Sequence, residues 1–191
     1  AGRSAQKPVP ISVSGATNFT ATAGDVTKID TAEALRIANV IAGLDHDTNL
    51  HVDFGDTDTP PHIAFIGDTH IGLTGSLRRT VSLSARKRPA DERIADVLTA
   101  LGLDNLLNAP RGLDQRVAEN GKGLSAADTL RLDLARAVLG EADLIVVASL
   151  RWEAERDSAP LLDTLRRLTP ATIILADAAN HPKSAEIWKV D

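Results

Sequence analysis

The sequence of 191 residues contains no cysteine, no methionine and no tyrosine. Without cysteine, the chain cannot form disulfides, cysteine-ligated zinc sites or a thiol nucleophile. This cysteine usage fits a reducing cytosol. Aromatic residues make up only 3% of the chain, so we expect a core of leucine, isoleucine, valine and alanine.

Long apolar runs and an excess of positive charge are also missing. No run approaches the roughly 18 apolar residues of a membrane-spanning helix, and no signal peptide is evident at the start. The net charge of -5 argues against a nucleic-acid-binding domain, because that class needs a basic surface. The chain opens at Ala1. We interpret it as an excised piece of a longer protein, and a membrane part could lie outside it.

The composition present is that of one globular domain, with 43% hydrophobic and 25% charged residues. Residues 1–10 are predicted to be a flexible lead-in. Residues 11–25 alternate apolar with polar side chains and predict one or two strands. Apolar side chains at helical spacing predict a helix over 31–44, and residues 43–61 are rich in turn formers.

Short, fully apolar runs predict three buried strands, at 63–66, 144–148 and 172–176. Segments with helical spacing of apolar residues separate them, at 91–107, 125–140 and 158–168. Buried strands that alternate with helices are typical of an α/β fold with a mainly parallel sheet. Residues 75–124 contain no comparable run and are predicted to be a helical insertion, and 187–190 a short edge strand.

Three segments, 63–83, 100–147 and 171–191, together resemble the nucleotide-binding domain of ABC transporters of the exporter type. The middle segment is the most specific, because the pattern GLD…V.E.G..LS……L.LARA.L keeps its spacing over several dozen residues. The resemblance implies a P-loop-NTPase-like (ABC ATPase) fold with a central mainly parallel sheet and flanking helices. It also implies that 11–191 form one domain, with a helical subdomain at about 76–135.

The family's phosphate-binding loop is not matched at the expected positions. Its lysine and its magnesium-binding hydroxyl align with Ala34 and Leu35. Asp30 and Glu33 stand at the start of the same predicted helix, where the helix dipole stabilises carboxylates in place of a phosphate. Lys28 is the nearby cation. We therefore predict that this site does not bind ATP in the usual way.

The remaining catalytic positions of the family are replaced as well. The aspartate that orders Mg²⁺ and the glutamate that polarises the attacking water align with Ala148 and Ser149, which can do neither. The Q-loop position is Asp68. The switch-histidine position is Ala178, and His181 follows three residues later.

The segment LSAAD, residues 124–128, aligns with the family's signature. Alanines replace two glycines that let the backbone approach a phosphate, and Asp128 replaces a glutamine. Ser125 keeps a hydroxyl that could reach a phosphate, although the pattern also fits an ordinary helix N-cap. Arg131 and Arg136 align with family arginines and are expected to make structural hydrogen bonds.

A basic cluster follows the first buried strand and consists of Arg78, Arg79, Arg86, Lys87 and Arg88. Two interpretations stay open for it. The cluster fits a solvated face. It also fits a docking surface, because in the resembled family the neighbouring segment docks on cytoplasmic loops of the membrane domain. Five cations there could meet an acidic partner loop or anionic lipid.

A different enzyme class is suggested weakly by three short motifs. GDTD at 55–58, GDTH at 67–70 and the pair at 180–181 superficially resemble the metal-binding residues of binuclear metallophosphoesterases. Their order is wrong for that class, and aspartate, histidine and glycine are common in turns.

These observations predict a degenerate, ATPase-silent nucleotide-binding domain that binds no cofactor, no metal and no nucleic acid. The expected partners are a transmembrane domain and, in a homodimer or heterodimer, another nucleotide-binding domain, and the expected location is the cytoplasmic face of the cell membrane. In a mixed dimer, Ser125 is the residue that could reach the partner's ATP. One alternative is a working transporter ATPase that binds ATP and Mg²⁺ through displaced groups, namely Lys28, Asp68, Glu153 and His181. The other is a soluble regulatory or scaffold protein on the same frame.

Overall fold

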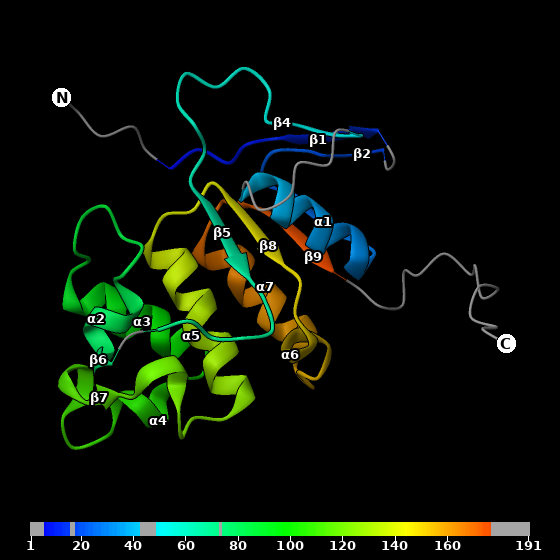
Figure 1. Ribbon diagram of the computed structural model, residues 1–191. Coiled ribbons are helices and arrows are strands. Elements are labelled where there is room, and N and C mark those ends of the chain that lie inside the picture. Colours follow the sequence, from blue (N-terminus) through cyan, green and yellow to red (C-terminus); the bar gives the residue numbers. More distant parts are fainter. Residues whose placement is uncertain (1–5, 16–17, 43–48, 73, 177–191) are drawn as a thin grey trace, which may run out of the picture.

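The centre of the computed structural model, which describes residues 6–15, 18–42, 49–72 and 74–176, is a four-stranded parallel sheet (Figure 1). Its strands lie in the order β3 (Val26–Ile29), β9 (Thr172–Ala176), β8 (Leu144–Val147) and β5 (Ile63–Ile66). All three neighbouring pairs are parallel. The sheet confirms the predicted α/β fold.

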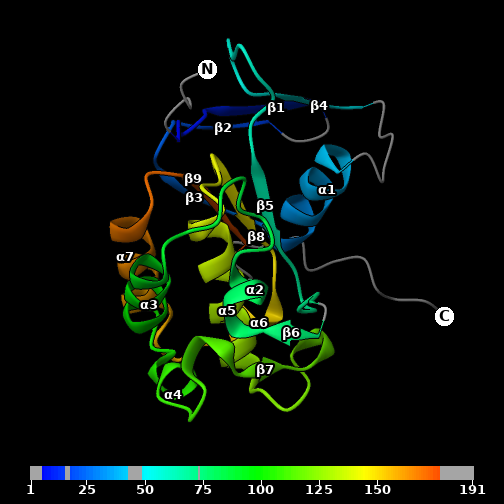
Figure 2. The ribbon, with the colours of Figure 1, turned by 90° about the vertical axis from the view of Figure 1, so that its left-hand side faces the viewer.

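Helices cover both faces of this sheet (Figures 1 and 2). On one face, α1 (Thr31–Ile41) packs on Leu144 and Val146. On the other face lie α5 (Ala126–Leu139) and α7 (Ser158–Leu168), which share a core with Ile145 and Val147. Because successive residues of a strand face opposite sides, β8 has to be apolar at every position, and this explains its unbroken apolar run.

A second, antiparallel sheet packs on the outer side of α1. It contains β2 (Phe19–Ala21), β1 (Ile11–Gly15) and β4 (Leu50–Asp53), in that order. Ile11, Val13 and Leu50 are buried in the core that α1 also joins. The prediction of turns throughout 43–61 is therefore wrong for 50–53, where the alternation of buried and exposed residues is short but forms a strand.

The region 75–124, which we call the helical region, packs on α5 beyond the carboxyl end of the sheet (Figure 2). Its helices are α2 (Leu77–Val81), α3 (Asp91–Ala100) and α4 (Asp104–Leu107). The region also contains a short strand pair, because β6 (Gly75–Ser76) pairs with β7 (Arg116–Val117). Two residues each are too few to give a sequence pattern.

Three further predictions need correction or qualification. Of the lead-in, residues 6–10 are part of the fold: Gln6 donates hydrogen bonds to the Ala142 carbonyl and to Thr169 Oγ1, and Val9 is buried. The strand 63–66 forms but lies at the sheet edge, where Phe65 is 50% exposed. The edge strand expected at 187–190 lies outside the described residues.

Within the described chain, no helix combines the length and apolarity that crossing a membrane requires.

Candidate functional site

A single residue, Asp30, connects β3 to α1. Its Oδ1 accepts hydrogen bonds from the backbone N–H of Ala32, at 2.8 Å, and of Glu33, at 3.4 Å. The Asp30 residue is only 8% exposed. Backbone N–H groups at the start of a helix attract anions because they have no partner within the helix. Here the chain's own carboxylate occupies them.

The two residues aligned with the family's lysine and metal-binding hydroxyl follow in the first turns of α1. Ala34 is fully buried and packs with Ile37 and Ala38 in the core beneath the helix. Leu35 is 40% exposed. Lys28 lies on the edge strand β3 with an exposed side chain. A side chain at position 34 thus faces the core, and a longer one would have to displace core residues.

The carboxyl ends of β5 and β8 are tied directly to each other. Ala148 N–H donates to the Ile66 carbonyl at 2.9 Å, and Leu150 N–H donates to Asp68 Oδ1 at 2.6 Å. Ser149 is buried, and its Oγ accepts from the N–H of Arg151 as the N-cap of α6 (Leu150–Glu153). The structure therefore brings the predicted residues Asp68, Ala148 and Ser149 to the same pair of strand ends; Asp68 and Ala148 take part in the hydrogen bonds that link the two ends, and Ser149 caps α6.

Glu153 and the start of α1 also meet. Thr31 Oγ1 donates a hydrogen bond to Glu153 Oε1 at 3.3 Å, which places a second carboxylate beside the helix start capped by Asp30. Among the described residues, no group of three or more histidines, aspartates and glutamates could hold a metal ion. The pair at 180–181, one of the three motifs behind the metallophosphoesterase interpretation, lies outside the described residues. Ala178 and His181 lie outside the described residues.

Ser125 is the N-cap of α5. Its Oγ accepts a hydrogen bond from the N–H of Asp128 at 3.0 Å and donates to Asp128 Oδ2 at 2.8 Å. The first of these bonds is the N-cap bond of the capping interpretation of the LSAAD segment, and the second holds the serine and aspartate side chains together. The expectation for the two arginines is confirmed, because Arg131 contacts Glu155 at 3.3 Å and Arg136 donates to the Ile71 carbonyl at 2.8 Å.

Sequence reasoning missed a buried ionic cluster beside these strand ends. Asp133 on α5 lies 2.6 Å from His70 Nδ1 through Oδ1 and 2.8 Å from Arg151 Nη2 through Oδ2. The only sequence signal is an aspartate between the buried residues Leu132 and Leu134. Its partners are 63 and 18 residues away along the chain, so no local spacing could identify them.

Within the basic cluster, Arg78 is engaged in the fold. Its Nε and Nη2 donate to the two carboxylate oxygens of Asp91, both at 2.9 Å, and its Nη1 donates to Asp114. The hydrogen bond from Arg78 lowers the pKa of the Asp91 carboxyl, and the same bond raises the pKa of the Arg78 guanidinium. Arg78 therefore joins α2 to α3.

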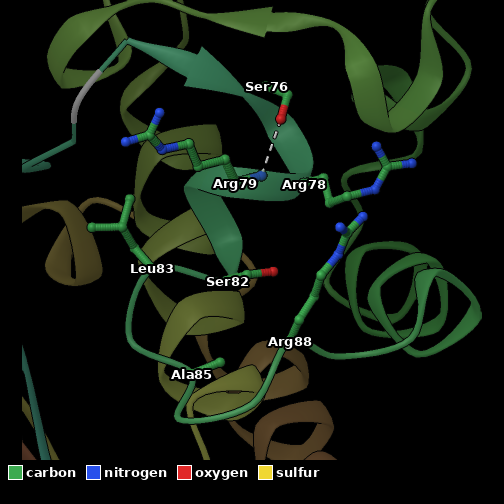
Figure 3. Close-up of a pocket in the computed structure, with 7 residues that line it drawn as sticks. All are labelled: Ser76, Arg78, Arg79, Ser82, Leu83, Ala85 and Arg88. Carbon is green, nitrogen blue, oxygen red and sulfur yellow. Dashed lines mark hydrogen bonds between the residues drawn. The ribbon is translucent and has the colours of Figure 1, made fainter.

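Three arginines of the basic cluster, Arg78, Arg79 and Arg88, line a groove beside α2 (Figure 3). The groove has a volume of about 490 Å³ and is lined by Ser76, Arg78, Arg79, Ser82, Leu83, Ala85 and Arg88. Leu83 is 49% exposed. In the described part of the chain, Arg79 has no ion-pair partner, and Arg88 lies 3.9 Å from Asp91. Arg86 and Lys87 are exposed on the connection from α2 to α3, outside this groove.

Comparison with known proteins gives consistent neighbours. No family model matches the sequence. An uncharacterised ABC transporter ATP-binding protein of Sinorhizobium fredii is 29% identical over 127 residues, which cover 65% of this chain and 22% of that protein. An ATP-dependent lipid A-core flippase of Vibrio cholerae is 25% identical over 144 residues, covering 73% and 25%. A structure of a bacterial Atm1-family ABC exporter with ATP bound matches 92% of this chain and 35% of that chain, with a TM-score of 0.71 and 15% identity.

The chain is a distant relative of ABC exporter nucleotide-binding domains. This relationship confirms the predicted resemblance at the level of the fold and of homology. The chain spans about a fifth to a quarter of the curated relatives named here.

Proposed function

We propose that this chain is a nucleotide-binding-domain-like module of an exporter-type transport protein, that it neither binds nor hydrolyses ATP, and that it acts by docking. One observation carries the proposal: the connection between β3 and α1 is one residue, Asp30, whose carboxylate caps the helix. The relationship to exporter domains supports the transport context.

The residues at this helix start fit a magnesium nucleotide poorly. A phosphate cradle needs a glycine-rich turn with unoccupied backbone N–H groups and a lysine beside them. Asp30 occupies two such N–H groups, and the methyl of Ala34 is buried. A triphosphate would also meet the carboxylates of the buried Asp30 and the exposed Glu153, and like charges repel.

The strand ends that would face the γ-phosphate support the same proposal. Ala148 and Ser149 offer no carboxylate to order magnesium or to polarise water. Asp68, which follows β5, accepts a hydrogen bond from the Leu150 N–H at 2.6 Å. One carboxylate oxygen of Asp68 is therefore already engaged by a hydrogen bond within the fold.

Docking is supported by the groove beside α2. Arg79 and Arg88 supply positive charge at its walls and Leu83 supplies an exposed apolar side chain. A protein segment that carries carboxylates and an apolar residue fits this combination. In an exporter the expected partner is the membrane domain at the cytoplasmic face. Pairing with a second copy, or with an active nucleotide-binding domain, would complete the assembly.

Phosphate release from ATP by the purified chain tests the catalytic part of the proposal. We expect no turnover above a protein-free blank in the presence of magnesium. Turnover that disappears on Lys28→Ala or Glu153→Gln would contradict the proposal. Such a result would instead assign a working ATPase with displaced catalytic groups.

A further inference from the structure

The segment 67–72, which leads from β5 toward the helical region, is held by hydrogen bonds from three other parts of the chain. The Gly67 carbonyl accepts from Arg151 Nη2 at 2.5 Å, and the Ile71 carbonyl accepts from Arg136 Nη1 at 2.8 Å. Further along, the Gly72 carbonyl accepts from the N–H of Asn120 at 2.8 Å. A short connection is thus bonded to α6, to α5 and to the turn before α5.

Asp133 stands at the centre of these contacts. Its carboxylate joins His70 of the segment to Arg151 of α6, at 2.6 and 2.8 Å, and Arg136 Nη1 lies 3.9 Å away. The side chains of His70, Arg151 and Asp133 are 2%, 9% and 10% exposed. Breaking a buried ionic network leaves charges without a partner in a medium of low polarity, and such networks are therefore opened rarely.

Close packing confines the imidazole as well. Gly121 has φ +68, and a Cβ there would lie 2.7 Å from Thr129 Cγ2 and 3.2 Å from His70 Cδ2. A Cβ on Gly72 would lie 2.9 Å from His70 Nε2. Glycine at both positions lets the backbone pack closely against the ring, and this packing restricts movement of His70 away from Asp133.

We propose that Asp133 is the hub of an internal lock that clamps segment 67–72 and α6 to α5. The lock fixes the carboxyl ends of β5 and β8 relative to each other, and it fixes the path by which the chain enters α2. The groove beside α2 is therefore presented on a rigid support. The lock follows from the contacts around Asp133 and is independent of whether the module binds a nucleotide.

Amide hydrogen exchange, measured by NMR on the whole chain, tests the lock. Three amides report on it: Gly72, Asn120 and Leu150, whose N–H groups donate within the clamped region. In the wild type we expect them to exchange slowly. In Asp133→Asn, which keeps the shape but removes the charge, we expect their exchange to rise about tenfold or more, while Ile174 in the sheet stays slow.

A matched control and a milder variant make the outcome decisive. Asp91→Asn removes a different carboxylate that also pairs with an arginine, and it should leave all three amides unchanged. His70→Gln removes only the imidazole. It should raise the exchange rates of the same amides to a smaller extent. If Asp133→Asn fails to fold, His70→Gln takes its place as the test variant. Unchanged exchange of the three amides in a folded variant would overturn the lock. A parallel rise at Ile174 would also overturn it, because the effect would then be global.

Discussion

The Oδ1 atom of Asp30 lies 2.8 Å from the backbone nitrogen of Ala32 and caps α1 at the point where the strand β3 ends. The proposed function rests on this hydrogen bond, which the Asp30 side chain makes within its own helix start. The bond stabilises the helix and, at the same time, uses an N–H group that an anion would otherwise approach.

Removing this cap should destabilise the fold measurably. We expect Asp30→Ala to lower the free energy of unfolding by about 1 kcal/mol, the usual loss for an N-cap side chain. Asp30→Asn, which keeps an oxygen acceptor, should stay close to the wild type. Urea denaturation followed by circular dichroism measures both, with Asp56→Ala at an exposed position as the control. Equal stability of Asp30→Ala and the control would refute the capping role.

The cap of α5 gives a second prediction. Ser125→Ala should also cost about 1 kcal/mol of stability, because the N–H of Asp128 loses its acceptor. The exposed Ser84, replaced by alanine, is the matched control and should change little. Thermal unfolding of the two variants under identical conditions checks this. A Ser125→Ala variant as stable as the control would show that the hydroxyl is not engaged in the free chain.

The Arg78–Asp91 pair predicts a pH dependence. Arg78 holds the pKa of the Asp91 carboxyl below its ordinary value of 3.8. Because the folded-state pKa is the lower one, the pair stabilises the fold above about pH 4, and this contribution is lost as the pH falls through the folded-state pKa. Asp91→Asn should therefore differ most from the wild type near pH 7, and the difference should shrink toward about pH 3. A difference in urea midpoint that stays constant with pH would contradict this.

The groove gives a prediction about binding. A fluorescent peptide with three glutamates and two leucines should bind the purified chain. The double variant Arg79→Glu, Arg88→Glu should weaken that binding about tenfold or more, since each reversal replaces attraction by repulsion. The double variant Arg166→Glu, Arg167→Glu, an equal charge change on α7, is the control. Fluorescence anisotropy measures the affinities. Equal weakening by the control, or stronger association with vesicles of anionic lipid than with the peptide, would contradict docking of an acidic protein segment.

Much of the sheet could be predicted from sequence because burial on both faces leaves an unbroken apolar run. This holds for β8 and β9, which lie inside the sheet. By contrast β3, with the sequence VTKI, is an edge strand with partly exposed polar side chains, and no apolar pattern identifies it. Edge strands gain their conformation from pairing with a neighbour, and pairing is not encoded in local periodicity.

The candidate site shows the same division between local and distant information. The caps at Asp30 and Ser125 depend on neighbouring residues. The sequence therefore placed Asp30 at the start of a helix and offered an N-cap as one interpretation of Ser125. The cluster of His70, Asp133 and Arg151 joins segments far apart in the chain, and only the folded chain brings them together. The groove depends on both local and distant information. Its arginines are close in sequence, but Arg78 is hydrogen-bonded to Asp91 and Asp114, which lie farther along the chain.

Isothermal titration calorimetry of the purified chain with Mg-ATP, and separately with Mg-ADP, tests the central claim most directly. If the chain's own carboxylate holds the start of α1, no heat of binding beyond dilution should appear at nucleotide concentrations up to about 1 mM, a range in which even weak sites are detected. Binding with a micromolar Kd, weakened by substitutions in the first turn of α1, would contradict the account.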